Sequence, residues 1–570
     1  MSSPALDVDQ SAVGDLLGVA EEPMQSADPV GLGRSLMTAM LGAARRPSVP
    51  LQATAKLVGG LVQASAAVSA RMVGARSAGP VAPDARDRRF EDRAWSDNGV
   101  FFGIMQSYLL VDRWFTELVE RSEIPEPAAS KARFASRLLL DAAAPTNVLL
   151  TNPQALRRAF DTGGTSVVRG LEHLLHDVAT NGGWPSQVDR SSFHLGDNMA
   201  ATPGRVVFRN DLIEVLQYEA QTAEVHQIPM LFCPPWINKF YIMDLAPQKS
   251  LIEWAVQHGL TSFAISYRNP DSSMRDLSFD DYLIQGPRAA LDAIRTITGA
   301  EKVNTLAVCL GGTLNTVLLA YLNAMGDDLV HTSTYLNALN DFGDAGTLKD
   351  VFTDPQTVEG LARRMEAKGY LEASDMARTF DLLRARDLVF RYVETNWLMG
   401  EDPPAFDLLA WNADSTRMPA KMHAYYLRRC WIDNALPHDE LSVAGTPMLV
   451  SEIAQDTYVV AAREDHIVPW RSSYQTTQLF KGPCRFVLSS SGHIAGIVNP
   501  PNPKSRLWVN EDLPATPERW LEGATELHET WWNDWISWIV PRSGELGAPP
   551  PMGNPSFPVL EAAPGTYVHG

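Results

Sequence analysis

The sequence predicts an α/β fold in which helices cover both faces of a mostly parallel sheet. From about residue 200 onward, short apolar runs alternate with helical patterns, an order that is typical of parallel strands joined by helices. In addition, the apolar run Val303–Val308 ends at Cys309, small residues follow at once, and a helical pattern begins at Leu314. Strand, sharp turn and helix in direct succession bring a side chain to the carboxyl end of a sheet, where ligands of such folds bind.

Composition narrows the class of protein. The chain has 570 residues, of which 45% are hydrophobic, and a formal net charge of −19, which disfavours binding to nucleic acid or to anionic membranes. The four cysteines are far apart and form no C-x-x-C pair, which argues against a zinc site or a disulfide scaffold and indicates a reducing cytosol. We expect no cofactor and no metal. No apolar run reaches 18 residues and no basic leader opens the chain, so neither a transmembrane segment nor a secretory signal is expected.

The first 200 residues are predicted to form two helical parts. Residues 1–86 are predicted to form a mobile, helical N-terminal arm with Ala- and Gly-rich amphipathic pieces, and residues 79–89 read as a linker. The alternative is a surface-seeking amphipathic segment, and the sequence does not reveal the role of this arm. Residues 87–200 form a helical N-terminal domain, in which apolar residues recur at spacings of three and four.

Residues 201–570 are predicted to form the catalytic domain. Its expected strands are Val206–Phe208, Leu212–Tyr218, Ile228–Cys233, Leu260–Tyr267, Val303–Val308, Thr457–Ala462 and Cys484–Leu488. Helices are expected over Asp244–His258, over Phe279–Thr298 and after Cys309, and the Pro- and Gly-rich tail after Pro541 is expected to be extended. The alternation lapses over about residues 341–441, which we interpret as a mobile cap; a rigid domain that supports dimerisation is the alternative.

Cys309 occupies the nucleophile position of a G-x-S-x-G elbow, with Ala307 and Gly311 at the two small positions. The N-terminus of the following helix would favour a thiolate, which is the reactive form. A buried structural cysteine is the alternative interpretation of this motif alone.

The last two predicted strands supply the rest of a catalytic triad. Asp465 follows one of them and His493 the other, so the chain order is nucleophile, acid and base, as in the α/β-hydrolase fold. We predict that His493 is the general base and that Asp465 orients it. The backbone N–H groups of Leu310 and Ile237 are the predicted oxyanion donors. The role of His466, which directly follows the acid, stays open.

These residues lie in motifs that resemble those of the polyhydroxyalkanoate synthases, most closely class I. The resemblance extends from about Asp87 to the C-terminus. It rests on Pro234–Tyr241, Val308–Thr313, Arg463–Pro469 and Gly492–Pro501. Ala307 departs from the family, which has Gly there, and the extra methyl group is expected to tighten the elbow without abolishing it.

The resemblance implies an acyltransferase that polymerises (R)-3-hydroxyacyl-CoA, with short-chain monomers such as 3-hydroxybutyryl-CoA, and releases CoA. It implies that Cys309 is the family nucleophile, Asp465 its acid and His493 its base, with an acyl-cysteine intermediate. It further implies a homodimer, without a second type of subunit, at the surface of cytoplasmic polyester granules. The sequence fixes neither the range of monomer lengths nor the residues that contact CoA.

Two other functions fit part of the pattern. A thioesterase or polyester depolymerase of the same fold would use the same triad and give the acyl group to water. A granule-coating protein without catalysis is the alternative from another class, and the intact triad order speaks against it.

Overall fold

The computed structural model describes residues 28–75 and 77–570, which form two compact units. The helical unit contains the described residues up to Pro185 together with Asp350–Leu361 and Arg384–Asp402. The sheet unit contains Ser186–Lys349, Ala362–Leu383 and Pro403–Gly570. Two pieces of the predicted cap thus belong to the helical unit. Residues 1–27 of the predicted arm lie outside the described residues, and the separate roles of arm and cap stay predictions.

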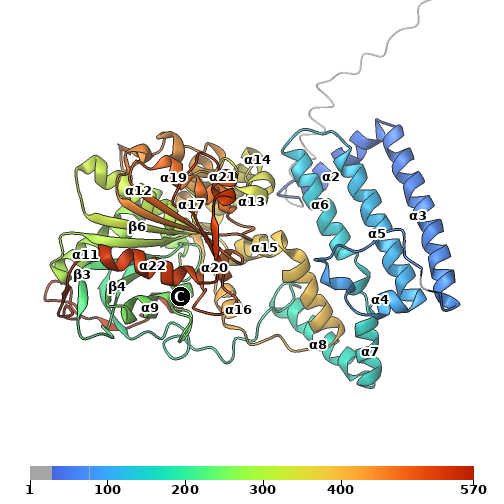
Figure 1. The fold of residues 1–570 in the computed structure, drawn as a ribbon, viewed down its shortest axis with the longest axis horizontal. Coiled ribbons are helices and arrows are strands. Elements are labelled where there is room, and N and C mark those ends of the chain that lie inside the picture. The colour runs from blue at the N-terminus through green and yellow to red at the C-terminus, as the bar shows by residue number, and fades with distance from the viewer. Residues whose placement is uncertain (1–27, 76) are drawn as a thin grey trace, which may run out of the picture. The chain divides into compact units, whose positions relative to one another are not determined.

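The helical unit is built on long helices that pack side by side (Figure 1). Its helices are α2 (Leu32–Ala44), α3 (Ser48–Met72), α4 (Ala94–Asp97), α5 (Gly99–Glu120), α6 (Ala128–Ala142), α7 (Pro153–Asp161) and α8 (Thr165–Thr180). Local sequence fixes two of the starts: the Asn98 and Asn152 side chains accept backbone N–H groups of the first turns of α5 and α7. The predicted helical pattern is therefore confirmed for this part of the chain.

Ion pairs attach the two later segments to the helical unit. Arg386 lies 2.7 Å from Asp141 on α6, which also pairs with Arg89. Lys131, also on α6, lies 2.5 Å from Asp354. These side chains are mostly buried, so each charge needs its partner, and the pairs fix where residues 350–361 and 384–402 pack.

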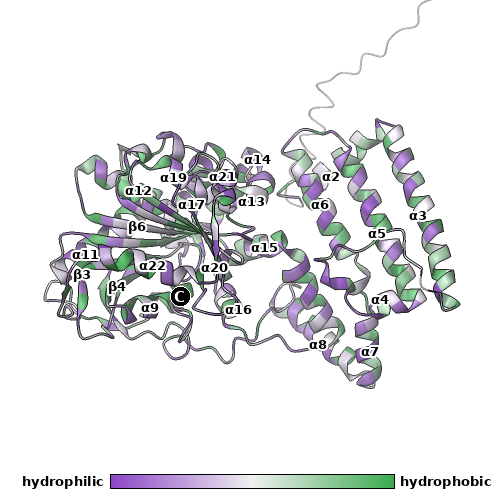
Figure 2. Ribbon diagram, in the orientation of Figure 1, coloured by the Kyte–Doolittle hydropathy of each residue, from purple (hydrophilic) through white to green (hydrophobic). Residues whose placement is uncertain are grey.

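The surface of the helical unit keeps many apolar side chains. Figure 2 shows green and purple residues interspersed along α3 and α5, as amphipathic helices require. Leu51 and Val62 of α3 are 72% and 65% exposed. Within the described ranges, none of the helices combines the length and apolarity that crossing a membrane requires.

The sheet unit contains a twelve-stranded mixed sheet, ordered β14-β13-β12-β11-β6-β5-β3-β4-β2-β1-β16, with β15 also paired to β3. The six central strands, from β12 to β4, are parallel to one another. The strands are β1 (Gly204–Arg209), β2 (Ile213–Tyr218), β3 (Val225–Cys233), β4 (Leu260–Tyr267), β5 (Val303–Val308), β6 (Val330–Leu336), β11 (Asp456–Ala462), β12 (Cys484–Ser489), β13 (Leu507–Val509), β14 (Thr525–Leu527), β15 (Leu546–Gly547) and β16 (Glu561–Ala562). This mixed sheet confirms the predicted α/β class.

Helices surround the sheet (Figure 1). They include α9 (Leu251–Gln257), α10 (Phe279–Leu283), α11 (Ala289–Thr298), α12 (Leu310–Met325), α18 (Trp470–Tyr474), α19 (Thr476–Leu479), α20 (His493–Ile497), α21 (Pro517–Glu522) and α22 (Trp531–Ile539). The segment between β6 and β11 forms five further α-helices: α13 (Gly346–Phe352), α14 (Pro355–Lys368), α15 (Ala373–Leu383), α16 (Asp407–Asn412) and α17 (Ala420–Tyr426).

Two expected helices are shorter than predicted. The helix expected over Asp244–His258 begins only at Leu251, because the Ser250 side chain caps it by accepting the Glu253 N–H. The helix expected over Phe279–Thr298 is interrupted at Gly286, whose backbone is non-helical and which precedes a proline. The tail is not merely extended, since β15 and β16 pair with β3 and β1.

The strand β6 was not expected from the sequence. Its centre reads Thr332, Ser333 and Thr334, which is too polar to predict a buried strand, yet all three residues are at most 1% exposed. Their hydroxyl groups bond to Asn304, Asn315 and Trp535. Paired polar groups can be buried at little cost, which is why this strand lies in the middle of the sheet.

Candidate active site

Cys309 lies in a strained turn at the carboxyl end of β5. Its φ of 51° and ψ of −119° fall in a region that residues other than glycine rarely adopt. The Cys309 N–H donates to the Leu336 carbonyl at the end of β6, and α12 begins at the next residue. The turn therefore lifts a partly exposed thiol above the sheet, as the sequence predicts.

The small residues around Cys309 are required by close backbone approach. A Cβ atom on Gly311 would lie 2.5 Å from the Cys233 carbonyl oxygen and 2.6 Å from that of Pro234. Ala307 is fully buried on β5, and the elbow forms with this residue in place. Contact at Gly311 also brings the start of α12 against the loop that follows β3.

Asp465 and His493 meet across the loops that follow β11 and β12. His493 Nδ1 donates to Asp465 Oδ2 at 2.6 Å, and Asp465 Oδ1 accepts the N–H groups of Ile467 and Val468, each at 2.8 Å. Holding the carboxylate in this way fixes the imidazole, with Nε2 on its far side. Cys309 lies close enough to the His493 imidazole to raise the pKa of that group, so the structure brings the three predicted triad residues together.

The charge state of His493 depends on these neighbours. Burial alone lowers the pKa of His493, but the charges and hydrogen bonds of Asp465 and Cys309 outweigh it and raise this pKa to about 10. The Asp465 side chain is fully buried and His493 is 6% exposed. An imidazolium that is stabilised beside a thiol can keep a proton taken from the sulfur.

The loop after β3 carries the second predicted oxyanion donor, Ile237. Thr416 binds this loop through the carbonyls of Trp236 and Ile237, and the Trp411 indole donates to the Lys239 carbonyl at 2.9 Å. The Lys239 ammonium in turn donates to the carbonyls of two tail residues, Val568 and Gly570. These hydrogen bonds therefore fix the loop through its backbone carbonyl groups. That Leu310 and Ile237 donate to one oxyanion stays a prediction.

Three residues that support the site were missed by the sequence reasoning. Asn337 donates its side-chain amide to the His493 carbonyl at 2.5 Å. The indoles of Trp531 and Trp532 donate to the carbonyls of Gly496 and Ile497 and so hold α20 in place. The only signal was the Trp-rich stretch at 531–538, which by itself is read as core.

Other candidate features lie apart from Cys309. His466 directly follows Asp465, and whether it has a chemical role stays open.

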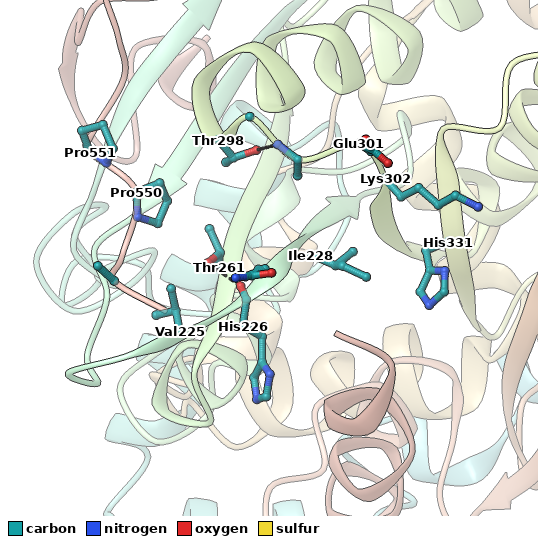
Figure 3. A pocket seen from close by; sticks show the side chains of 14 residues that line it. Val225, His226, Ile228, Thr261, Thr298, Glu301, Lys302, His331, Pro550 and Pro551 are labelled. Atoms are coloured by element: carbon teal, nitrogen blue, oxygen red, sulfur yellow. Dashed lines mark hydrogen bonds between the residues drawn. The ribbon is translucent and has the colours of Figure 1, made fainter. Parts of the chain in front are cut away.

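A cavity of about 700 Å³, shown in Figure 3, is lined by the amino ends of β3, β4 and β6 and by the segment before β5, including Val225, Thr261 and His331. Cys309 lies at the opposite, carboxyl end of β5, which is where ligands of parallel sheets bind. Among the described residues, no three His, Cys, Asp or Glu side chains are grouped to hold a metal ion.

Comparison with known proteins gives matches along nearly the whole chain. Residues 86–255 match the family described as the poly-beta-hydroxybutyrate polymerase (PhaC) N-terminus, and residues 210–500 match the alpha/beta hydrolase fold. The chain is 42% identical over 527 residues to the poly(3-hydroxyalkanoate) polymerase of Methylorubrum extorquens, covering 92% of this chain and 87% of that protein. It is 40% identical over 506 residues to the poly(3-hydroxyalkanoate) polymerase subunit PhaC of Cupriavidus necator, covering 87% and 84%. It is also 40% identical over 495 residues to poly(3-hydroxyalkanoate) polymerase 1 of Ectopseudomonas oleovorans, covering 86% and 87%.

The contact at Gly311 gives a first prediction. Gly311→Ala should lower the free energy of unfolding by at least about 1 kcal/mol, because the new methyl group meets backbone oxygens that have no rotamer to move into. Gly360→Ala, on α14 with open space around it, is the matched control and should stabilise by about 0.5 kcal/mol. Chemical denaturation of both variants measures this, and equal stability of the two would contradict the packing described.

The raised pKa of His493 gives a second prediction. The folded state binds this proton more tightly than the unfolded chain, whose pKa is 6.5, so the stability it contributes is fully present below pH 6.5 and is lost as the pH rises towards 10. Between pH 6.5 and 10, the free energy of unfolding should therefore fall further in wild type than in Asp465→Asn, which lacks the carboxylate that raises this pKa. Urea unfolding at several pH values tests this, and parallel profiles would count against it.

Proposed function

The chain belongs to the poly(3-hydroxyalkanoate) polymerase family and is an enzyme that transfers acyl groups into polyhydroxyalkanoate, and we propose that it does so through an acyl-Cys309 intermediate. The proposed substrates are (R)-3-hydroxyacyl-CoA thioesters with short chains, such as 3-hydroxybutyryl-CoA, and CoA is released. The observation that carries the proposed mechanism is the chain of contacts from Asp465 through His493 to the thiol of a strained elbow.

In the proposed acylation step, the Cys309 sulfur attacks the carbonyl carbon of the thioester. His493 takes the thiol proton, and the N–H groups of Leu310 and Ile237 stabilise the oxyanion. The bond between the carbonyl carbon and the CoA sulfur then breaks, and His493 returns the proton to the leaving CoA thiolate. Because one thioester replaces another, the acyl-enzyme lies close in free energy to the substrate.

In the proposed elongation step, the 3-hydroxyl group of the next acyl unit attacks the acyl carbon on Cys309. His493 takes the hydroxyl proton, the new ester bond forms, and the bond to the Cys309 sulfur breaks. The proton passes from His493 back to that sulfur. Asp465 keeps Nδ1 protonated throughout, so that Nε2 is the nitrogen that accepts and returns the proton.

Assembly and location follow from the resemblance to class I enzymes. We propose a homodimer, without a second type of subunit, at the surface of cytoplasmic polyester granules. The competing function is hydrolysis by a thioesterase or depolymerase, which would use the same three residues with water in place of the hydroxyl group. The product distinguishes the two: insoluble polyester indicates the polymerase, and free hydroxy acid indicates the hydrolase.

The nucleophile is tested by removing its sulfur. Cys309→Ala should lower both CoA release from 3-hydroxybutyryl-CoA and polyester yield by at least about 10³-fold, because no acyl-enzyme can form. Cys309→Ser should also be severely impaired, since an alcohol is a much weaker acid than a thiol. Cys484→Ala is the matched control, because Cys484 begins β12 and is remote in sequence from the elbow, and it should retain activity. Near-normal turnover by Cys309→Ala would refute the assignment.

The roles of base and acid predict unequal losses. His493→Ala removes both proton transfers, whereas Asp465→Ala only weakens the orientation of the base, so we expect the former to lose roughly 10 to 100 times more activity. Initial rates of CoA release in the two variants, with His466→Ala as the comparison, measure this. If His466→Ala lost more activity than His493→Ala, the base would be wrongly assigned.

A further inference from the structure

Three buried side chains near Cys309 have unmet hydrogen-bonding capacity. Within the described residues, no partner meets the Trp236 indole nitrogen, either ring nitrogen of His423 or the Tyr426 hydroxyl group in good geometry. Trp431 approaches the Tyr426 oxygen, but an indole N–H only donates, so the proton of this hydroxyl still lacks an acceptor. Trp236, His423 and Tyr426 are each 2% exposed.

The three side chains form one cluster. His423 and Tyr426 lie one turn apart on α17, with ring centroids separated by 6.1 Å. The Tyr426 ring meets the Trp236 ring edge to face at 5.3 Å, with an angle of 88° between the planes. Phe279 and Phe342 pack against Tyr426 and complete an apolar wall.

The cluster borders the nucleophile. A Cβ atom on Gly311, two residues after Cys309, would lie 2.6 Å from the carbonyl oxygen of Pro234, two residues before Trp236, so the two backbone segments touch. Burial raises the pKa of Tyr426 most, and Cys430 and then Cys309 raise it further. Trp236 directly precedes Ile237, the predicted oxyanion donor. A group attached to the Cys309 sulfur would therefore have this cluster as a neighbour.

Unpaired polar atoms in such a place are costly to the folded protein. Phenylalanine or leucine would fill comparable volumes without leaving buried donors and acceptors unpaired. Three such groups in contact with one another, beside the predicted nucleophile, point to a ligand that supplies their partners.

The acyl group offers one suitable atom. Its carbonyl oxygen is assigned to the N–H groups of Leu310 and Ile237, and its carbon chain is apolar. The remaining polar atom of a 3-hydroxyacyl group is the oxygen on carbon 3. We propose that Trp236, His423 and Tyr426 form a subsite that hydrogen-bonds this 3-oxygen; the proposal rests on the acyl-Cys309 intermediate proposed above.

The chemistry of the three groups fits a hydroxyl group. Burial lowers the pKa of His423 to about 4, so its imidazole is neutral at pH 7 and presents one donor and one acceptor. The indole donates, and the phenol donates or accepts. A hydroxyl group needs both kinds of partner, whereas an acyl group without the 3-oxygen would leave the hydrogen-bonding capacity of all three side chains unmet. The subsite should therefore select 3-hydroxyacyl groups against plain acyl groups.

The test compares acylation by 3-hydroxybutyryl-CoA and by butyryl-CoA, which differ only in the 3-oxygen. The single-turnover burst of CoA release and the mass of the adduct on Cys309 report acylation before any elongation. In wild type, acylation should be at least about tenfold faster with the hydroxylated substrate. Tyr426→Phe should lower this ratio about tenfold while leaving the butyryl rate unchanged, and His423→Phe should change it in the same direction.

Tyr425→Phe is the matched control. It makes the same substitution one residue earlier, but the Tyr425 hydroxyl already donates to the Ser442 carbonyl at 2.7 Å, and this variant should keep the wild-type ratio. The melting temperature gives a second readout. Tyr426→Phe removes a buried hydroxyl group whose proton lacks an acceptor, so its unliganded form should melt no lower than wild type.

The outcomes separate the subsite from the proposed function. An adduct on Cys309 with an unchanged substrate ratio in Tyr426→Phe would overturn the subsite alone. A lower melting temperature for Tyr426→Phe would do the same, because it would show that the hydroxyl group stabilises the unliganded fold through a partner that is already present, such as the Trp431 indole or a buried water. Absence of any adduct in wild type would overturn the acyl-cysteine mechanism, and the subsite with it.

Discussion

The site depends on one backbone constraint, the strained turn at Cys309. A residue with φ of 51° and ψ of −119° persists only when its surroundings hold it. Here the N–H of Cys309 is fixed by Leu336 on β6, and Gly311 fits against the carbonyls of Cys233 and Pro234. The strands β3, β5 and β6 thus act together to present one thiol. Because α12 starts immediately afterwards, the same turn also leaves the Leu310 N–H at a helix N-terminus.

The position of the base is set by a second, independent set of contacts. His493 is held from three sides: by Asp465 at Nδ1, by Asn337 at its carbonyl and, through α20, by Trp531. The carboxylate that orients it is itself fixed by two backbone N–H groups. Proton transfer between fixed atoms requires rigid support of this kind. The buried tryptophans of α22 contribute to it, because their indoles hold α20.

Local chemistry could be read from the sequence, whereas the supports could not. The elbow, the order of Cys309, Asp465 and His493, and most strands follow from short patterns of small, apolar and polar residues. The strand β6 was not predicted because its hydroxyl groups pair with partners such as Asn304, 28 residues away, and a local sequence pattern does not reveal such a pairing. The break at Gly286 was visible as a Gly-Pro pair, but the apolar period around it was stronger.

The proposed subsite could not be predicted from the sequence, for a related physical reason. His423 and Tyr426 are separated from Trp236 by more than 180 residues, and only the folded chain puts their rings in contact. In a sequence, each is read as an ordinary core residue of a helix or loop. Their unmet hydrogen-bonding capacity becomes visible only once burial and partners are known together. If a ligand meets this capacity, the same three side chains bind the substrate and lower the stability of the unliganded protein. Selectivity for the substrate and stability of the free fold then oppose each other at this site.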